Sequence, residues 1–447
     1  MKKSRFPHPL TLLSGCILAA AVLTYILPAG EYQRQDDPTT GRSVVMAGTY
    51  DHVERSPVNF FDAVVAIPKG MGEAADVIFL VFLIGGAFTV VDKTGALRNG
   101  MAWLVRALDG RTILVIPIVS LAFATGGVLE NMQEEIIALV PVLLILTRRL
   151  GFTPLTAVSM SAGAAFVGSA FSPINPFQVG IAQGLAELPP LSGWAFRMVF
   201  LALALGFWIW TTMHHAIKTQ TEPEVVEDEE DHPVSARDGI VLGLVLATFG
   251  VLVYGLMELG WDFDQMSALF FIMGAVAGIV GGLKIGGTAQ AYVTGFREMA
   301  YAALLIGFAR AIFVVLEQGH IVDTIVNGLF TPLADLPLGL SAMGMVAAHT
   351  VIHVPVPSVS GHAVLTMPLL VPLSDLLGMS RQVTVLAYQY GAGLCDLVTP
   401  TNGALLAILA AGGVRYEEWF KFALPRYLAL VALGGVAIAV ALATGLQ

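Results

Sequence analysis

The chain has 447 residues, of which 56% are hydrophobic and 13% are charged, and its mean hydropathy is +0.77. Soluble domains carry about 25% charged residues, so this composition excludes a soluble globular enzyme. A helix that crosses a bilayer needs about 20 mostly apolar residues, and such stretches recur along the whole chain. We therefore predict an all-α polytopic membrane protein. The net charge of -10 mostly reflects one acidic stretch, residues 222–231, which we interpret as a solvated linker.

Residues 1–73 form the first predicted unit, with a transmembrane helix at about 9–28 and a polar segment at about 30–73. Two lysines and an arginine precede the helix, and basic residues collect on the cytoplasmic side of a membrane. We therefore expect a multi-pass protein of the inner (plasma) membrane whose N-terminus is cytoplasmic. The polar segment is then external.

Residues 74–217 form the second predicted unit, which begins with a crossing at about 75–92. Residues 111–149 contain two apolar arms of about 13 residues each, too short to cross comfortably at 1.5 Å per residue. The polar run Glu130 to Glu135 separates the arms, and arginines lie at both ends. These features predict a re-entrant hairpin that opens to the cytoplasm. A broken helix at about 153–187 and a crossing at about 193–217 follow it.

Residues 218–298 form a predicted unit that contains the acidic cytoplasmic linker and two scaffold helices, at about 237–257 and 265–283. The last unit is 299–447, with a crossing at about 299–316, a second hairpin at about 336–377, a second broken helix at about 380–412 and a crossing at about 418–445. No Lys or Arg lies between Asp335 and Asp375, so the second hairpin is expected to open to the outside.

An internal repeat relates the two halves at an offset of 227 residues. The matching segments are Pro141 with Pro368, Leu150-Gly151 with Leu377-Gly378, and Ser172-Pro173-Ile174-Asn175 with Thr399-Pro400-Thr401-Asn402. Because each proline motif follows one of two oppositely oriented hairpins, the pattern predicts inverted structural repeats. Such repeats are typical of secondary transporters, which bind substrate where paired helices are broken.

Proline removes a backbone donor and clashes with the preceding helical turn, so we predict breaks at 171–177 and 396–403. Unwound backbone survives in a membrane only where it is buried in protein or lines a cavity. The alternative is a pair of proline kinks with satisfied side chains. The candidate substrate-binding residues on the breaks and hairpin tips are Asn131, Ser172, Asn175, Ser358, Ser360, Thr399, Thr401 and Asn402.

Ionisable residues inside a membrane are functional candidates because their burial is costly. Glu134, Glu135 and Asp396 are candidates for ion coupling, through Na⁺, a proton or a substrate amine. Capping of the second hairpin arm is the alternative for the two glutamates. Arg310 has a planar fork suited to a substrate carboxylate, and its alternative role is an ion pair with one of these acids.

Three histidines, His349, His353 and His362, flank the second hairpin tip. Their spacing, without a nearby cysteine, does not predict a zinc site, and a proton-sensitive gate is the other possibility. We predict no metal and no cofactor beyond a coupling Na⁺ or H⁺. The sequence offers no nucleophile and base pair and no phosphate loop, so we expect neither an enzyme nor a nucleic-acid partner.

The chain resembles the YfcC family of inner-membrane carriers, which is grouped with anaerobic C4-dicarboxylate carriers and basic amino acid antiporters. The motifs that carry the resemblance are Leu27-Pro28-Ala29-Gly30-Glu31-Tyr32, Asn175 to Gln183, Ser358 to Gly361, Pro372 to Gly378, Arg381-Gln382-Val383 and Thr399 to Asn402. The resemblance implies an ion-transporter superfamily architecture with a scaffold domain, often dimeric, and a transport domain of two opposed hairpins and two broken helices.

These observations together predict a secondary active transporter for a small carboxylate-bearing metabolite, an amino acid above all. Transport would be ion-coupled symport or exchange through an elevator-like mechanism, in a homodimer embedded in the lipid bilayer. A C4-dicarboxylate carrier is the alternative within transport. A passive channel is the alternative of another class.

Overall fold

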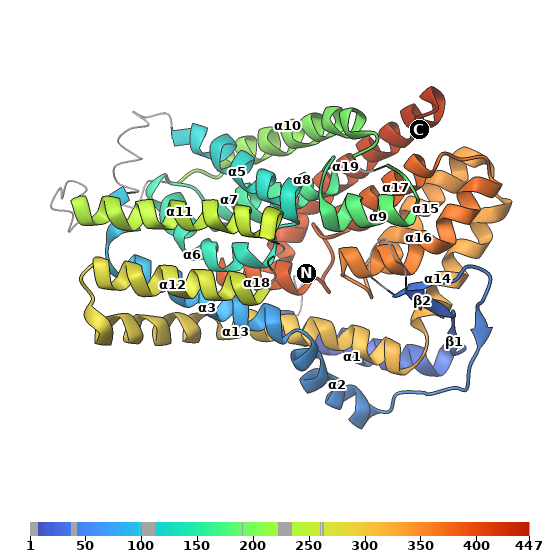
Figure 1. The fold of residues 1–447 in the computed structure, drawn as a ribbon, viewed down its shortest axis with the longest axis horizontal. Helices are drawn as coiled ribbons and strands as arrows, with labels where there is room; N and C mark the ends of the chain where they lie inside the picture. Colours follow the sequence, from blue (N-terminus) through green and yellow to red (C-terminus); the bar gives the residue numbers. More distant parts are fainter. Residues whose placement is uncertain are drawn as a thin grey trace, which may run out of the picture.

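The computed structural model describes residues 8–36, 43–97, 99–100, 112–189, 191–221, 235–259, 261 and 263–446. Within these ranges, eight helices are long and apolar enough to cross a membrane. Helices dominate the ribbon, and the short strands are confined to one end of it (Figure 1). The predicted fold class, an all-α polytopic membrane protein, is therefore confirmed.

The N-terminal part contains more helix than the sequence predicted. Helix α1 (Pro9–Ile26) leads into two small antiparallel sheets, in which β1 (Gly30–Glu31) pairs with β4 (Asp51–His52) and β2 (Arg34–Asp36) pairs with β3 (Ser43–Val45). The end of the segment expected to be polar and external is helix α2 (Phe60–Glu73). A Cβ atom on Gly70 would lie 2.7 Å from the carbonyl oxygen of Gly307, so this glycine lets α2 pack directly against a later helix.

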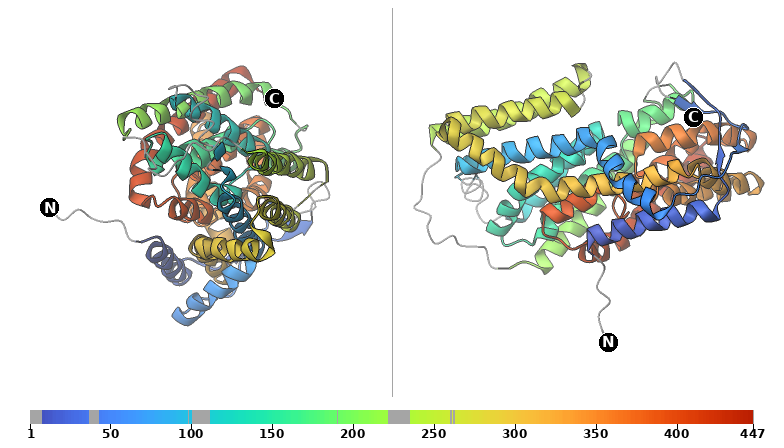
Figure 2. Two further views of the ribbon diagram at one scale, coloured as in Figure 1. Left: turned by 90° about the vertical axis from the view of Figure 1, so that its left-hand side faces the viewer. Right: turned by 90° about the horizontal axis from the view of Figure 1, so that it is seen from below.

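That later helix is α13 (Lys284–Gln318), which has 35 residues and a length of about 52 Å at 1.5 Å per residue. The predicted crossing at 299–316 covers only its second half, because the polar residues of its first half hid the continuous helix. It packs beside α3 (Ala75–Lys93) and α12 (Phe263–Val280), and α12 contacts α11 (Ala236–Leu259) (Figures 1 and 2).

The first repeat region holds the first hairpin and the first broken helix. The hairpin consists of α5 (Val115–Glu130) and α6 (Glu134–Arg149), preceded by a 3-10 turn (Thr112–Leu114). The broken helix comprises α7 (Pro154–Val158), a π-helical turn (Ser159–Gly163), α8 (Ala164–Ala170), a second π-helical turn (Pro176–Gly180) and α9 (Ile181–Leu185). Helix α10 (Trp194–Lys218) closes the region.

The second repeat region has the same order of elements. Helix α14 (Val322–Phe330) and a 3-10 turn (Thr331–Asp335) precede the second hairpin, α15 (Leu338–His353) and α16 (Val359–Leu376). The broken helix comprises α17 (Arg381–Tyr388), a π-helical turn (Gln389–Gly393) and α18 (Gly403–Ala411), and α19 (Tyr416–Thr444) ends the chain.

The two hairpins end in the same way at the predicted offset. Gly151 and Gly378 both have a positive φ, 75° and 67°. The N–H after each glycine donates to a carbonyl five residues earlier, from Phe152 to Thr147 and from Met379 to Ser374, over 2.8 Å in each case. This is the Schellman arrangement, which favours glycine because only glycine adopts positive φ without strain. The match supports a duplication, and its inversion across the membrane stays a prediction.

The two hairpins approach the middle of the molecule from opposite ends. In Figure 1, α5 and α6 lie in the left half and α15 and α16 in the right half. Buried tryptophans pack between the halves, where Trp208 of α10 lies beside Trp419 of α19 with ring centroids 6.4 Å apart. Hydrogen bonds between the hairpins and the breaks place the tips and both breaks in one central region.

Candidate functional site

The first break lies between Ala170, the last residue of α8, and Pro176. Proline is favourable at the first position of a helix because its missing N–H has no partner there, so Pro176 starts the next helix instead of kinking it. Asn175 caps this helix, and its Oδ1 accepts hydrogen bonds from the N–H groups of Phe177 and Gln178 over 2.9 Å each. The break is therefore a capped junction between two helices.

Neutral groups of the first hairpin hold this break in place. Ser172 Oγ donates to the Val128 carbonyl over 2.8 Å, and Asn175 Nδ2 donates to the Gly127 carbonyl over 2.8 Å. Ser172 and Asn175 are both 0% exposed. Because the protein already uses these side chains, the geometry matches the alternative of satisfied side chains at the first break.

The second break, residues 394–402, is held by α19 and by the second hairpin. Trp419 Nε1 donates to the Leu397 carbonyl over 2.7 Å, and the Tyr416 hydroxyl donates to the Val398 carbonyl over 2.5 Å. Thr401 donates to the Val354 carbonyl at the hairpin tip. Carbonyl groups that lose their helical donors are thus paired again inside the protein, as unwound backbone in a membrane requires.

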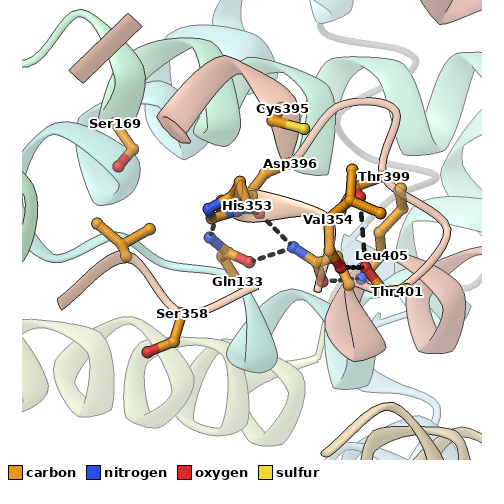
Figure 3. Close-up of polar contacts among 12 residues, drawn as sticks. Gln133, Ser169, His353, Val354, Ser358, Cys395, Asp396, Thr399, Thr401 and Leu405 are labelled. Atoms are coloured by element: carbon orange, nitrogen blue, oxygen red, sulfur yellow. Dashed lines mark hydrogen bonds and ion pairs between the residues drawn. The ribbon is translucent and has the colours of Figure 1, made fainter. Parts of the chain in front are cut away.

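Asp396 lies on the second break, and its carboxylate contacts both hairpins (Figure 3). Gln133 Nε2 of the first tip donates to Oδ2 over 3.0 Å, and His353 Nε2 of the second hairpin lies 2.8 Å from Oδ1. Asn402, which caps α18 at the N–H of Leu405, donates from Nδ2 to Oδ1 over 2.7 Å. The Asp396 side chain is only 4% exposed. One carboxylate therefore ties both hairpin tips to the second half-helix.

A cavity of about 540 Å³ opens beside this cluster. Nine of the predicted site residues line it: Asn131, Glu134, Glu135, Arg310, Ser358, Ser360, Asp396, Thr401 and Asn402. Ser172, Asn175 and Thr399 do not line it. The structure thus brings together the two hairpin tips and the second break. The polar candidates of the first break lie outside the lining, and from that predicted segment only the apolar Phe177 is among the described lining residues.

Arg310 lies between this cavity and a second one. Its Nε donates to Glu73 Oε2 over 2.8 Å, and its guanidinium lies 4.8 Å from the centre of the Phe313 ring. The side chains of Arg310 and Glu73 are 39% and 38% exposed. The acid that pairs with Arg310 is therefore Glu73, at the end of α2, and not one of the three acids that the sequence suggested. The second cavity, of about 580 Å³, shares Arg310, Phe313, Val356, Ser358 and Ser360 with the first.

From the sequence, His353 is named only as part of a possible proton-sensitive gate, and Gln133 and Glu73 are not candidates for the site. Gln133 lies in the polar run of the first tip, and His353 lies at the end of the second hairpin, so their positions in the sequence could have indicated a role in the site. Nothing in the sequence indicated Glu73, since only the packing of α2 on α13 brings it to Arg310. Glu135 Oε2 also accepts the backbone N–H of Gln133 over 3.2 Å, so part of its role is the capping that was the alternative.

The cavity lining holds four carboxyl groups, those of Glu73, Glu134, Glu135 and Asp396, against a single guanidinium, that of Arg310. Opposite charges near a buried carboxylate stabilise its ionised form, whereas like charges destabilise it. The lining therefore favours a cation or an ammonium group. Among the described residues, no group of three His, Cys, Asp or Glu side chains could hold a metal ion.

Comparison with known proteins places the chain in one family over nearly its whole length. The model of the family DcuC, C4-dicarboxylate anaerobic carrier, matches residues 6–443. The protein of Escherichia coli K12 named "Putative basic amino acid antiporter YfcC" is 34% identical over 374 residues, which cover 78% of this chain and 74% of the relative. An uncharacterized protein of Haemophilus influenzae is 28% identical, with 98% of this chain and 97% of the relative covered.

Two solved transporter structures also match. The YdaH transporter of Alcanivorax borkumensis gives a TM-score of 0.46 at 18% identity and covers 98% of this chain and 99% of its own. MtrF of Neisseria gonorrhoeae gives a TM-score of 0.41 at 17% identity, with 98% and 95% covered. From the family match and the eight apolar helices, we conclude that the chain belongs to the C4-dicarboxylate anaerobic carrier family and is a multi-pass membrane carrier of small molecules, not an enzyme.

Proposed function

We propose that the protein is a secondary active transporter for an amino acid, above all one with a second amino group. The observation that carries this proposal is the charge of the central cavity, where four carboxyl groups face one guanidinium. A substrate with an ammonium group would offset this excess of carboxyl groups. The name of the Escherichia coli relative, a basic amino acid antiporter, agrees with this chemistry.

The cavity offers separate partners for the two ends of such a substrate. Glu134, Glu135 and Asp396 lie together on the side of the first tip and second break and suit an ammonium group. Arg310 suits the carboxylate, because its guanidinium can donate two parallel hydrogen bonds. Ser358 and Ser360 lie at the N-terminus of α16, where free N–H groups and the helix dipole favour an anion.

The family description names C4-dicarboxylates, which keeps a dicarboxylate carrier as the alternative substrate class. A dicarboxylate would bring two more negative charges to a lining that already holds four carboxyl groups. The amino acid proposal requires no such repulsion. We also propose an elevator-like movement of the paired hairpins and breaks, driven by Na⁺ or H⁺ symport or by exchange, in a homodimer.

A thermal-shift screen of the purified protein tests the substrate class. Lysine, arginine, glutamate and succinate are added separately, with and without Na⁺. A ligand at 100 times its Kd raises the stability of the folded state by about 2.7 kcal/mol. We expect lysine or arginine to raise the melting temperature and succinate to leave it unchanged. Stabilisation by succinate alone would assign the alternative. The control variant, Glu134→Gln, should keep the melting temperature without ligand and lose most of the shift with lysine.

Membrane orientation is tested with single cysteines at two equivalent hairpin ends. Cysteines replace Arg148 and Asp375 one at a time in a protein that lacks Cys16 and Cys395. We expect an impermeant thiol reagent to label position 148 from the cytoplasm and position 375 from the outside. Labelling of both positions from one side would contradict the inverted repeat and the proposed orientation in the inner membrane.

A further inference from the structure

Three histidines of the second hairpin form a buried cluster next to Asp396. His349, His353 and His362 are all 0% exposed. His349 Nδ1 lies 2.8 Å from His362 Nε2, and the rings of His353 and His362 stack with centroids 5.7 Å apart. Among the described residues, His353 is the one of the three that contacts a carboxylate, through Nε2 and Asp396 Oδ1. The chain of groups leads from the cavity lining at Asp396 into the interior of the hairpin.

The hydrogen bonds of the cluster indicate its protonation state. Among the described residues, His349 Nε2, His353 Nδ1 and His362 Nδ1 are buried and have no hydrogen-bond partner. A buried N–H without an acceptor is costly, whereas a bare ring nitrogen has no proton to satisfy. Three neutral imidazoles leave one such N–H, on His349 Nε2 or His362 Nδ1, and each added proton would leave another. The arrangement therefore fits three neutral imidazoles best, with His353 donating its Nε2 proton to an ionised Asp396. Asp396 then accepts from Gln133, Asn402 and His353, as an ionised carboxylate can.

We propose that the pair formed by Asp396 and His353 is the proton-binding site of this carrier. A proton from water adds to the lone pair of His353 Nδ1, the Nε2 proton stays between the ring and Asp396, and no other bond changes. The new N–H has no acceptor among the described residues, and the ionised carboxylate on the other side of the ring offsets that cost. The charge of the pair rises from -1 to 0. The pair thus alternates between an anion that needs a cation beside it and a neutral unit that does not.

The groups around the pair restrict it to one proton. The titratable groups that face it are Glu134 and Glu135 at the first tip, His349 and His362, Tyr388 of α17 and Cys395 beside Asp396. The two glutamates carry no positive charge, so neither opposes a proton on His353. A second protonated histidine would lie in van der Waals range of the first without a carboxylate of its own. The proton therefore resides on His353, where the carboxylate compensates it.

Asp396 belongs to the proton site and to the cavity lining at once. An ammonium group placed against Asp396 while His353 is protonated would leave the unit with a net charge of +1. The proton and a cationic substrate therefore exclude one another, which makes the carrier a proton exchanger. This last step rests on the proposed function, whereas the proton site itself does not.

Histidine-selective ¹⁵N NMR of the full chain in lipid nanodiscs tests the proton site without any substrate. We expect one buried imidazole to gain a proton at Nδ1 as the pH is lowered, and the variant His353→Gln to remove that signal. Asp396→Asn keeps the size of the side chain and should abolish this protonation wherever the wild type shows it. The control His349→Gln, which removes a histidine without contact to Asp396, should leave it intact. The proposal is overturned if no buried imidazole titrates in the wild type, or if the titration persists unchanged in Asp396→Asn.

Proton release in weakly buffered solution tests the exclusion, with lysine as the probe. We expect about one proton to be released per lysine bound by the wild type, and none by Asp396→Asn. Lysine binding without proton release would overturn the exclusion. Titration of His353 without any lysine binding would support the proton site while contradicting the proposed substrate. The two failures are therefore distinguishable.

Discussion

The two breaks occupy equivalent positions in the chain, but they are held by different chemistry. At the first break, Ser172 and Asn175 bind backbone groups of the first hairpin, and each contact joins neutral partners. At the second, Asp396 binds side chains from both hairpin tips. A duplicated framework has therefore kept its helix caps, Asn175 and Asn402, while of the two breaks only the second carries an acid that lines the cavity.

The two breaks therefore differ in role: the first holds helices in place, and the second carries a group that can bind a proton or a cation. A break whose Ser and Asn side chains bind neutral backbone groups has no charge of its own that changes when a proton or a cation arrives. A break that contains a carboxylate changes its charge when a proton or a cation arrives, and low local polarity makes that change energetically large. We infer that the first break is a fixed element and the second is the responsive one.

The largest expected effect tests the acidic break. Asp396→Ala leaves Gln133, Asn402 and His353 without their common acceptor, and breaking such a buried pair typically costs about 3 to 5 kcal/mol. We expect a large fall in the melting temperature of the purified protein and no uptake. Asp396→Asn, the matched control, retains an acceptor oxygen and should fold nearly as well as the wild type. Equal melting temperatures of Asp396→Ala and the wild type would show that the hydrogen bonds of this carboxylate do not stabilise the fold.

The two cap residues give a direct comparison of the breaks. Asn175→Ala removes a helix cap and leaves buried N–H and carbonyl groups unpaired, at a cost of about 1 to 3 kcal/mol. We expect lower stability but measurable uptake by the protein that folds. Asn402→Ala loses a similar cap and also a donor to Asp396, so uptake should fall further at comparable stability. Thermal unfolding and uptake in proteoliposomes measure both quantities.

The opposite ranking would contradict the comparison. If Asn175→Ala abolished uptake while its melting temperature stayed normal, the first break would bind substrate directly. That outcome would restore the prediction from the sequence that both breaks contact the substrate in the same way.

The next prediction concerns Arg310, which lines the cavity from α13. Its ion pair with Glu73 is about two fifths exposed, and such pairs contribute roughly 0 to 1 kcal/mol, so Arg310→Lys should change the melting temperature little. If Arg310 holds the substrate carboxylate, loss of its bidentate fork should weaken lysine binding by about 1 to 3 kcal/mol. Glu73→Gln is the control for the ion pair alone. Unchanged affinity in Arg310→Lys would leave the N-terminus of α16 as the anion site.

The smallest expected effect concerns Asp323. This residue is a control for Asp396, because the charge of Asp323 is compensated by an arginine and that of Asp396 by a histidine. It lies in α14, outside the eight candidate spans, where Arg34 Nη2 donates to it over 2.9 Å. Burial raises the pKa of Asp323 above its ordinary 3.8, although the Tyr32 N–H and Arg34 act to lower it.

A carboxyl group with a raised pKa in the folded state stabilises the fold at low pH, and this contribution is lost as the pH rises through the folded pKa. The melting temperature of the wild type relative to Asp323→Asn should therefore be higher near pH 4 than near pH 7. A difference between the two proteins that stays constant with pH would mean that Asp323 does not titrate with folding. Unfolding scans at several pH values measure it.

The sequence by itself determined the fold class, the two hairpins and the two breaks. Local signals carried them, since apolar length, the prolines and the duplicated Gly151 and Gly378 act through nearby backbone. Arm length was less exact, because α5 and α6 have 16 residues each whereas the sequence predicted about 13. Most candidate residues at the tips and the second break also lie on the cavity.

Only the tertiary structure decided which polar groups meet. Gln133 and Asp396 are 263 residues apart, and Arg310 and Glu73 are 237 residues apart, so no local pattern could pair them. The sequence placed Asn175 and Asn402 in equivalent positions. In the structure, the side chain of Asn175 is buried and hydrogen-bonded within the protein, whereas Asn402 lines the cavity. Hydrogen-bond partners depend on which helices pack together, and that packing is a property of the whole chain.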